Sequence, residues 1–272
     1  MLFRSQSGGS VANTIANLAN LGGRAAYIGR VADDDLGRIF IHDMRSLGVD
    51  VRLEPVTGGA PTARSYILIT PDGERTMNTY LGASAELGPE NVTPETFGKP
   101  GIVLLEGYVW DMAAGQGAMA NALALAEKTG ARVALSLSDE WCVDRHHSKF
   151  AELIGRDVSI VVANETEILR LFEVKDFDAA VERASRTDAL FAITRSEKGS
   201  VIVQGREKIL QPAYPVAKVV DATGAGDAWM AGFLHGLTRG QSLAQCAGLG
   251  SRAATLVIQQ VGPRLEPGAL KA

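Results

Sequence analysis

The chain has 272 residues, of which 46% are hydrophobic and 21% charged, and its net charge is −4. This size allows one large buried core, and the acidic balance argues against a general attraction to nucleic acid. No apolar run is long enough to predict a membrane span, and the first ten residues lack the apolar stretch of a signal peptide. The cysteines Cys142 and Cys246 lie far apart, which favours buried thiols in a reducing compartment, so we expect a cytoplasmic protein.

Strand-like and helix-like segments alternate along the first part of the chain. Its predicted elements are a helix over 11–21, a short strand over 25–29 and an amphipathic helix over 36–47. Two β-rich runs follow, 62–70 and 74–81, and Pro71-Asp72-Gly73 between them is typical of a hairpin turn. We therefore expect residues from about 51 to 83 to form a small β lid.

From residue 101 the alternation becomes regular. The predicted strands cover 102–105, 133–137, 158–163 and 190–194, and helices are expected over 117–128, 144–154, from 165 onward and over 179–185. A hairpin over 200–203 and 208–211 and two helices, 225–237 and 243–260, complete the pattern. Continuous apolar strands separated by helices indicate a parallel sheet buried on both faces. We expect one three-layer α/β/α domain over residues 1–272, with a mostly parallel central sheet.

The most informative segment is Asp-Ala-Thr-Gly-Ala-Gly-Asp at 221–227. Its glycines allow the amides of Gly224, Ala225 and Gly226 to converge on one anion at the first turn of a helix. Asp227 would repel that anion unless it accepts a proton from an attacking hydroxyl. The pattern therefore predicts phosphoryl transfer to an alcohol, and a tight turn capped by Asp227 is the structural alternative.

Other nucleotide-binding motifs are absent from the sequence. Trp229 stands where a dinucleotide fingerprint needs its third glycine, and there is no GxxxxGK[ST] loop. The protein-kinase motifs are missing as well. A dinucleotide oxidoreductase, which the α/β rhythm alone would also allow, is therefore disfavoured.

Four ordered motifs together resemble those of the ribokinase-like (PfkB) carbohydrate kinase family over essentially the whole chain. They are GGxxxN at 8–13, NxxE at 164–167, the segment 194–199 before a strand, and DxxGAGD at 221–227. The stretches that look most like the bacterial adenosine-kinase-like branch are 75–83, 138–146 and 246–254. The resemblance implies ATP-dependent phosphorylation of a primary hydroxyl, with adenosine as the first candidate acceptor. A ribose or fructose-type sugar kinase and a truncated nucleotide-binding remnant without turnover are the alternatives.

The resemblance implies a set of catalytic roles. Asp227 would be the general base, and the amides of Gly224, Ala225 and Gly226 would hold the transferring phosphoryl group. Arg75 would reach from the lid toward the phosphates, and a solvent-facing charge on a strand is the alternative reading.

The acceptor is expected beside the first helix. The resemblance assigns its binding to Gly8, Gly9 and Asn13, because the glycines allow close approach and the Asn amide can both donate and accept. The alternative places Asn13 on a solvated helix face.

The resemblance places MgATP at the carboxyl-terminal edge of the sheet. The implied nucleotide-binding residues are Asn164, Thr194, Gly199, Gly224, Gly226, Ala247, Gly250 and Ser251. The implied metal residues are Glu167, Asn164 and Asp221, and the family also uses a monovalent cation such as K⁺ near the last of these. Structural alternatives are a capping box between Asn164 and Glu167, an N-terminal cap at Asp221, and close helix packing for the small residues of 247–251.

The chain departs from the family pattern at three places, one of which is Ala222, where a hydroxyl residue is common. Ser196 stands where the family usually has glycine. The family also begins with a strand and a Gly-x-x-x-x-Asp segment that grips the sugar, whereas only seven residues precede Gly8 here. We expect that strand and that Asp to be missing, because the start is placed too late or the chain is truncated. The expected partners are a small-molecule acceptor and MgATP, with a homodimer through the lid and neither nucleic acid nor membrane.

Overall fold

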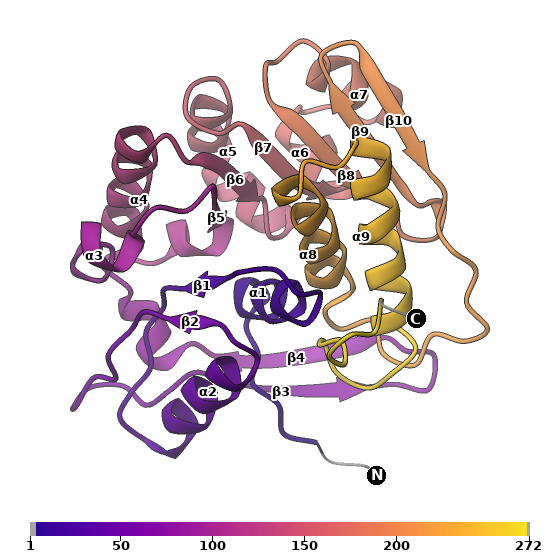
Figure 1. The fold of residues 1–272 in the computed structure, drawn as a ribbon. Coiled ribbons are helices and arrows are strands. Elements are labelled where there is room, and N and C mark those ends of the chain that lie inside the picture. The colour runs from indigo at the N-terminus through magenta and orange to yellow at the C-terminus, as the bar shows by residue number, and fades with distance from the viewer. Residues whose placement is uncertain (1–3, 271–272) are drawn as a thin grey trace.

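A six-stranded sheet forms the centre of the computed structural model, which describes residues 4–270 (Figure 1). Its strands, in spatial order, are β10 (Glu207–Gln211), β9 (Ser200–Gln204), β8 (Leu190–Thr194), β7 (Ile160–Asn164), β6 (Arg132–Ser136) and β5 (Ile102–Glu106). Strands β5 to β8 are parallel to one another, and the hairpin of β9 and β10 joins them in antiparallel fashion. The predicted, mostly parallel sheet with its closing hairpin is confirmed.

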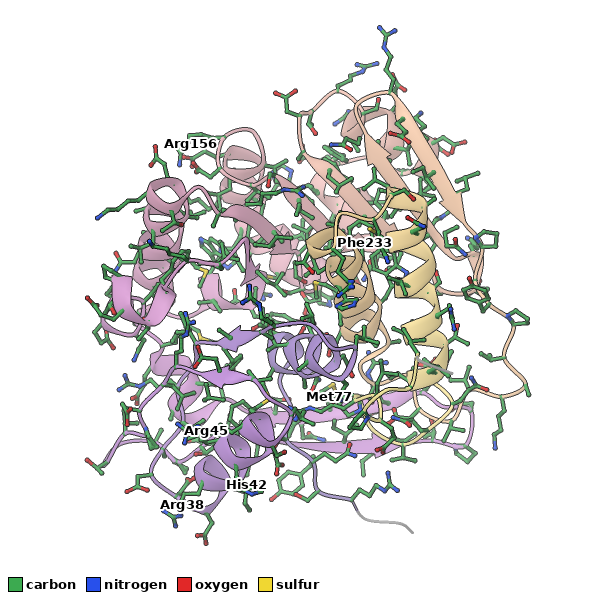
Figure 2. All side chains as sticks on the ribbon, in the orientation of Figure 1. Arg38, His42, Arg45, Met77, Arg156 and Phe233 are labelled. Carbon is green, nitrogen blue, oxygen red and sulfur yellow. The ribbon has the colours of Figure 1, made fainter. Side chains whose placement is uncertain are left out.

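Helices cover both faces of this sheet, as the apolar strands predict. One face packs against α4 (Gly115–Thr129), α5 (Glu140–Ile154), α6 (Glu165–Leu171) and α7 (Phe177–Ala184). The other face packs against α1 (Ser10–Asn20), α8 (Ala225–Thr238) and α9 (Leu243–Val257). Alternate residues of β7 serve the two cores, with Val161 facing the first and Ile160 and Val162 the second. Phe233 of α8 lies fully buried in this second core (Figure 2).

A smaller layer is formed by the chain between α1 and the predicted hairpin. It contains β1 (Ala26–Tyr27), α2 (Asp35–Ser46) and β2 (Asp50–Val51). The carboxylate of Asp34 caps α2 by accepting a hydrogen bond from the amide of Gly37 at 2.8 Å. The strand expected over 25–29 is only two residues long, and it pairs with β2 rather than with the six-stranded sheet.

Short helical segments connect these layers. They are the 3₁₀ turns η1 (Gly82–Glu86), η2 (Pro89–Asn91), η3 (Gly107–Asp111) and η4 (Ser196–Lys198), together with α3 (Pro94–Phe97). The last helix, α9, ends three residues earlier than its pattern predicts. Within residues 4–270, no helix combines the length and the apolar character that a membrane crossing requires.

The predicted hairpin forms a separate two-stranded ribbon, which we call the lid. Strands β3 (Arg64–Ile69) and β4 (Arg75–Tyr80) pair antiparallel, and every residue in them is exposed. In Figure 1 the ribbon runs beneath α8 and α9. At its tip, the carbonyl of Gly73 accepts a hydrogen bond from the amide of Ala222 at 3.3 Å. The lid tip therefore touches the segment that leads into the start of α8.

Candidate active site

Two helices begin at the same point of the molecule, and Asp227 lies there. Helix α1 starts after Gly9 and α8 starts after Gly224. The hydroxyl of Ser10 donates to Asp227 Oδ1 at 2.8 Å, and the amide nitrogen of Asn13 donates to Asp227 Oδ2 at 3.0 Å. The dipoles of both helix N-termini thus favour negative charge at this place.

Glycine stands at positions 224 and 226, at the start of α8, for different physical reasons. Gly224 has a φ of 77°, and a Cβ there would lie 2.3 Å from the Cβ of Pro263, so the fold itself requires glycine. Gly226 is exposed, and a Cβ there would meet no atom within 4 Å. Nothing in the fold fills the space before Gly226. A phosphoryl group at this place stays a prediction.

Asn13 and the first glycines lie at this site, but not as expected. Asn13 is only 6% exposed, so the alternative of a solvated helix face is wrong. Its amide contacts the predicted base directly, which gives it a role in holding Asp227 in addition to any contact with an acceptor. Gly8 and Gly9 are exposed at the entrance to α1, and a Cβ at Gly8 would meet no atom within 4 Å.

Burial and charge tune the titration of two carboxyl groups at the site. Burial raises the pKa of Asp227, and the hydrogen bonds from Asn13 and Ser10 oppose that rise. Glu106, at the end of β5, has its pKa raised to about 7 by burial and by the charge of Asp227. The sequence-based prediction does not assign Glu106 or Ser10 to the site. The position of Glu106 could have indicated it, because Glu106 directly follows the apolar strand residues 102–105 and ligands bind at the carboxyl ends of such strands.

Arg75 approaches the site from the lid. Its charge lies close enough to lower the pKa of Asp227, although the side chain is exposed on β4. Arg75 is thus an exposed strand residue whose charge reaches Asp227, and a role toward the phosphates stays a prediction.

The expected metal residues Asn164 and Glu167 form a capping box at the start of α6. Asn164 Oδ1 accepts from the amide of Glu167 at 2.9 Å, and Glu167 Oε2 accepts from the amide of Asn164 at 3.0 Å. Burial raises the pKa of Glu167 to about 7. A buried carboxylate beside an amide oxygen suits Mg²⁺, because a nearby cation would stabilise the charged form.

Asp221 is almost fully buried and is engaged by the backbone. Its Oδ1 accepts from the amide of Thr223 and its Oδ2 from the amide of Gly262, both at 2.8 Å. The carboxylate thus ties the segment before α8 to the segment after α9. The alternative of an N-terminal cap is wrong, because the N-cap of α8 is Gly224 and no side chain caps this helix. A metal or K⁺ role for this residue stays a prediction.

The segment 194–199 lies at the same edge of the sheet. Thr194 ends β8 opposite Asn164 of β7, so the two are neighbours there. Ser196 has a φ of 51°, a left-handed conformation that suits the glycine usual in the family. A Cβ at Gly199 would lie 2.1 Å from the carbonyl oxygen of Gln211, so chain packing alone accounts for this glycine.

The small residues of α9 face inward. Ala247, Gly250 and Ser251 are all buried. A Cβ at Gly250 would lie 2.8 Å from the carbonyl oxygen of Trp229, so close packing of α8 on α9 accounts for Gly250. Contact with an adenine ring stays a prediction for these positions.

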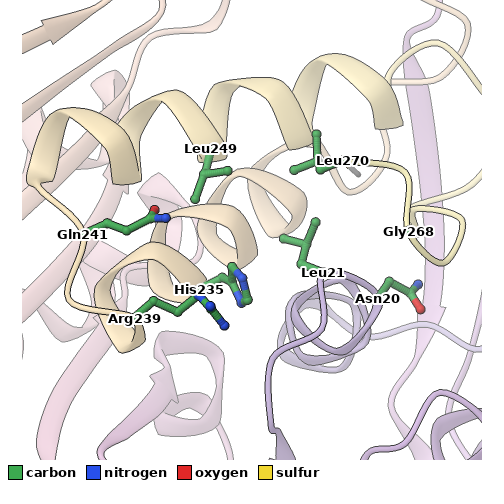
Figure 3. Close-up of a pocket in the computed structure, with 8 residues that line it drawn as sticks. All are labelled: Asn20, Leu21, His235, Arg239, Gln241, Leu249, Gly268 and Leu270. Carbon is green, nitrogen blue, oxygen red and sulfur yellow. The ribbon is translucent and has the colours of Figure 1, made fainter. Parts of the chain in front are cut away.

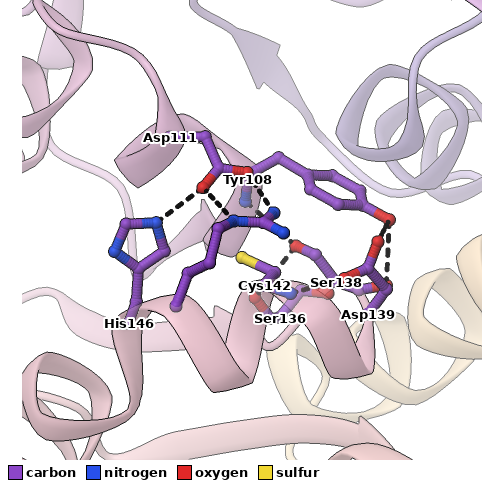
Figure 4. A network of polar contacts seen from close by, with 8 residues as sticks. Tyr108, Asp111, Ser136, Ser138, Asp139, Cys142 and His146 are labelled. Atoms are coloured by element: carbon purple, nitrogen blue, oxygen red, sulfur yellow. Dashed lines mark hydrogen bonds and ion pairs between the residues drawn. The ribbon is translucent and has the colours of Figure 1, made fainter.

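A polar network joins η3 to the segment between β6 and α5 and to α5 itself (Figure 4). The hydroxyl of Tyr108 donates to Asp139 at 2.8 Å, and Arg145 Nε donates to Asp111 at 2.8 Å. Asp111, Cys142 and His146 lie close enough to share a metal ion. However, Arg145 already pairs with Asp111, and burial raises the pKa of the Cys142 thiol to about 12. The described contacts therefore favour a structural anchor.

A separate cavity of about 130 Å³ lies at the far ends of α1 and α8 (Figure 3). Leu21, His235 and Leu249 contribute to its wall. Asp227 lies at the beginning of α8 and His235 near its end, so this cavity is remote from the predicted base.

Comparisons with known proteins agree with this geometry. A model described as pfkB family carbohydrate kinase matches residues 2–267. The crystal structure of adenosine kinase from Sinorhizobium meliloti is 49% identical, has a TM-score of 0.94 and covers 98% of this chain and 82% of that chain. The structure of a probable sugar kinase from Rhizobium etli CFN 42 is 45% identical, with a TM-score of 0.94, and covers 97% and 81% of the two chains.

A curated relative, ribokinase of Arabidopsis thaliana, is 28% identical over 268 residues, which are 94% of this chain and 68% of that protein. The fold and the site at the two helix N-termini define a kinase of the ribokinase-like class. The chain belongs to the pfkB family of carbohydrate kinases, and it is a sugar or nucleoside kinase. Kinases of this family use ATP with Mg²⁺.

Proposed function

We propose that the protein transfers the γ-phosphoryl group of ATP to the primary hydroxyl of a nucleoside, with adenosine as the first acceptor to test. The observation that carries the reaction type is Asp227, held by Ser10 and Asn13 beside the open space at Gly226. The choice of a nucleoside is supported by the 49% identity to the adenosine kinase of Sinorhizobium meliloti.

In the proposed reaction, Asp227 accepts the proton of the acceptor hydroxyl as its oxygen attacks the γ-phosphorus, and ADP leaves with the bridging oxygen. The amides of 224–226 stabilise the charge that spreads over the phosphoryl oxygens. Arg75 adds positive charge from the lid. Asn164 and Glu167 would hold Mg²⁺, which neutralises phosphate charge when bound.

A sugar is the second candidate acceptor. The 45% identity to the probable sugar kinase of Rhizobium etli and the similarity to a ribokinase support it. A nucleotide-binding protein without turnover is the third reading, and only an activity measurement separates it from the first two.

The decisive experiment is ADP release from MgATP with adenosine, ribose, fructose 6-phosphate or no acceptor, beside an Asp227→Asn variant. We expect turnover with adenosine and a loss of about 10²–10⁴-fold in kcat in the variant. Turnover with ribose alone would move the assignment to a sugar kinase. Turnover that Asp227→Asn leaves intact, or none with any acceptor, would contradict the proposed reaction.

We also propose that the chain works as one unit in the cytoplasm and associates through its lid. Both cysteines are buried and unbridged, which suits a reducing compartment. Exposed apolar side chains on the lid, such as Tyr66 and Leu68, favour association of two copies. A K⁺ requirement near Asp221 is a further proposal, which an assay with and without K⁺ can test.

A further inference from the structure

The segment after α9 passes the start of α8, runs along α1 and carries Arg264 to Asn13. Asn17 of α1 holds the backbone on both sides of this residue. Asn17 Nδ2 donates to the carbonyl of Pro263 at 3.0 Å, and the amide of Leu265 donates to Asn17 Oδ1 at 2.7 Å. The bond from the amide of Gly262 to Asp221 fixes the segment further back. The backbone of Arg264 is thus anchored beside α1, one helical turn from Asn13.

Arg264 contacts the amide that holds the predicted base. Its Nε donates to Asn13 Oδ1 at 3.4 Å, while Asn13 Nδ2 donates to Asp227 Oδ2 at 3.0 Å. If the Asn13 amide turned over, its oxygen would face the Asp227 carboxylate and its NH₂ group would face the guanidinium. A guanidinium has donors only, so it accepts only the orientation in which Asn13 donates to Asp227.

Among the described residues Arg264 forms no ion pair, although Asp43 lies close enough for its charge to oppose the effect of burial on the guanidinium pKa. Its Nη2 is buried and has no hydrogen-bond partner, and no carboxylate in residues 4–270 lies within ion-pair distance of its guanidinium. Burial lowers the pKa of this guanidinium. An unpaired half-buried cation is unfavourable for folding, so a structural ion pair does not explain its position.

Building on the proposed kinase reaction, we propose that Arg264 is a positioning residue that orients the Asn13 amide, so that Asn13 donates to Asp227 and aims this carboxylate at the acceptor hydroxyl. Four groups face Asp227 directly or through charge: Ser10 and Asn13 from α1, Arg75 from β4 and Glu106 from β5. Arg264 acts on Asp227 only through Asn13.

The test uses Arg264→Met, which keeps the bulk and removes the donor, and Arg264→Lys, which keeps a donor-only cation. Arg45→Leu is the matched control, because Arg45 is exposed on α2 (Figure 2). In Arg264→Met we expect kcat to fall about tenfold with little change in the acceptor KM, a size typical of one hydrogen bond to a charged group. Arg264→Lys should recover most of this loss, and Arg45→Leu should match the unsubstituted protein.

A second readout does not need turnover. The carboxyl ¹³C signal of Asp227, identified by its loss in Asp227→Asn, reports the titration of this group in the protein without substrates. The pKa of Asp227 should rise in Asn13→Ala, which removes the donated hydrogen bond, and in Arg264→Met, which no longer orients the amide that donates it. In the Asn13→Ala background, Arg264→Met should have no further effect on the signal or on kcat.

Three outcomes would overturn the proposal. The first is a rise in KM with unchanged kcat in Arg264→Met, which would mean that Arg264 binds the acceptor. The second is additive losses of kcat from the Arg264 and Asn13 substitutions. The third is an unchanged pKa of Asp227 in Asn13→Ala. This measurement tests the proposal even if Arg264→Met does not fold. Absence of turnover in the unsubstituted protein would sink the kinase proposal but would leave the titration test of Arg264 standing.

Discussion

At the residue scale, the two glycines of the segment 221–227 differ, because the fold requires Gly224 but does not require Gly226. A Cβ at Gly224 would overlap Pro263, whereas a Cβ at Gly226 would project into open space. Both glycines lie in the same motif, and both were expected to hold a phosphoryl group through their amides. Alanine substitutions at the two positions therefore distinguish a folding defect from a catalytic one.

We predict that Gly226→Ala leaves the free energy of unfolding unchanged or raises it by up to about 1 kcal/mol, because alanine is the better helix residue. Its methyl group should still lower kcat, since it enters the space expected for the phosphoryl group. Gly224→Ala should instead destabilise the fold by about 1–3 kcal/mol through strain and overlap. Denaturant unfolding and ADP release on both variants check this. A Gly226→Ala variant with full activity would argue against a phosphoryl site there.

At the element scale, the side chains of the lid strands point alternately to its two faces. Residues opposite each other in an antiparallel pair share a face, so Arg75 lies with Ile69 and Met77. Tyr66 and Leu68 lie on the other face, where they are 63% and 61% exposed. Because the charge of Arg75 reaches Asp227, we assign this face to the site and propose the Tyr66 face for the partner.

We predict that the double substitution Tyr66→Glu and Leu68→Glu weakens self-association without unfolding the protein. Both side chains are largely exposed, so the change in the free energy of unfolding should stay within about 0.5 kcal/mol for each. Sedimentation velocity measures the association, and Leu210→Glu is the control, because Leu210 is 75% exposed on the edge strand β10. A protein that sediments as a monomer before any substitution would contradict association through the lid.

At the scale of the whole molecule, distant segments converge on one carboxylate. Helices α1 and α8, strand β5, the lid and the segment after α9 all bring side chains to Asp227 or to Asn13 beside it. This convergence concentrates two carboxyl groups, and the stability of the unliganded protein should depend on pH as a result.

The pKa of Glu106 is about 7 in the folded protein and lies near its ordinary value of 4.5 when unfolded. Between these values the folded state keeps a proton that the unfolded state has lost, so the free energy of unfolding should fall as pH rises from about 4.5 to 7. Glu106→Gln should reduce this fall by on the order of 1–3 kcal/mol and stabilise the protein at pH 8. Urea unfolding at pH 5 and pH 8 tests it. A pH dependence that the substitution leaves unchanged would show that Glu106 does not titrate in this range.

The sequence by itself determines the alternation of strands and helices, the lid hairpin and the family, and it predicts a phosphoryl site in the segment 221–227. These features are encoded locally, because hydrophobic period and turn residues act over a few positions and the motif is contiguous. Only the tertiary structure decides that Asn13 holds Asp227, that Glu106 lies near it and that both oxygens of Asp221 bind backbone amides. The pair Asn13–Asp227 is 214 residues apart in sequence and Arg264–Asn13 is 251 apart, so packing of whole elements brings them together and no local pattern predicts them.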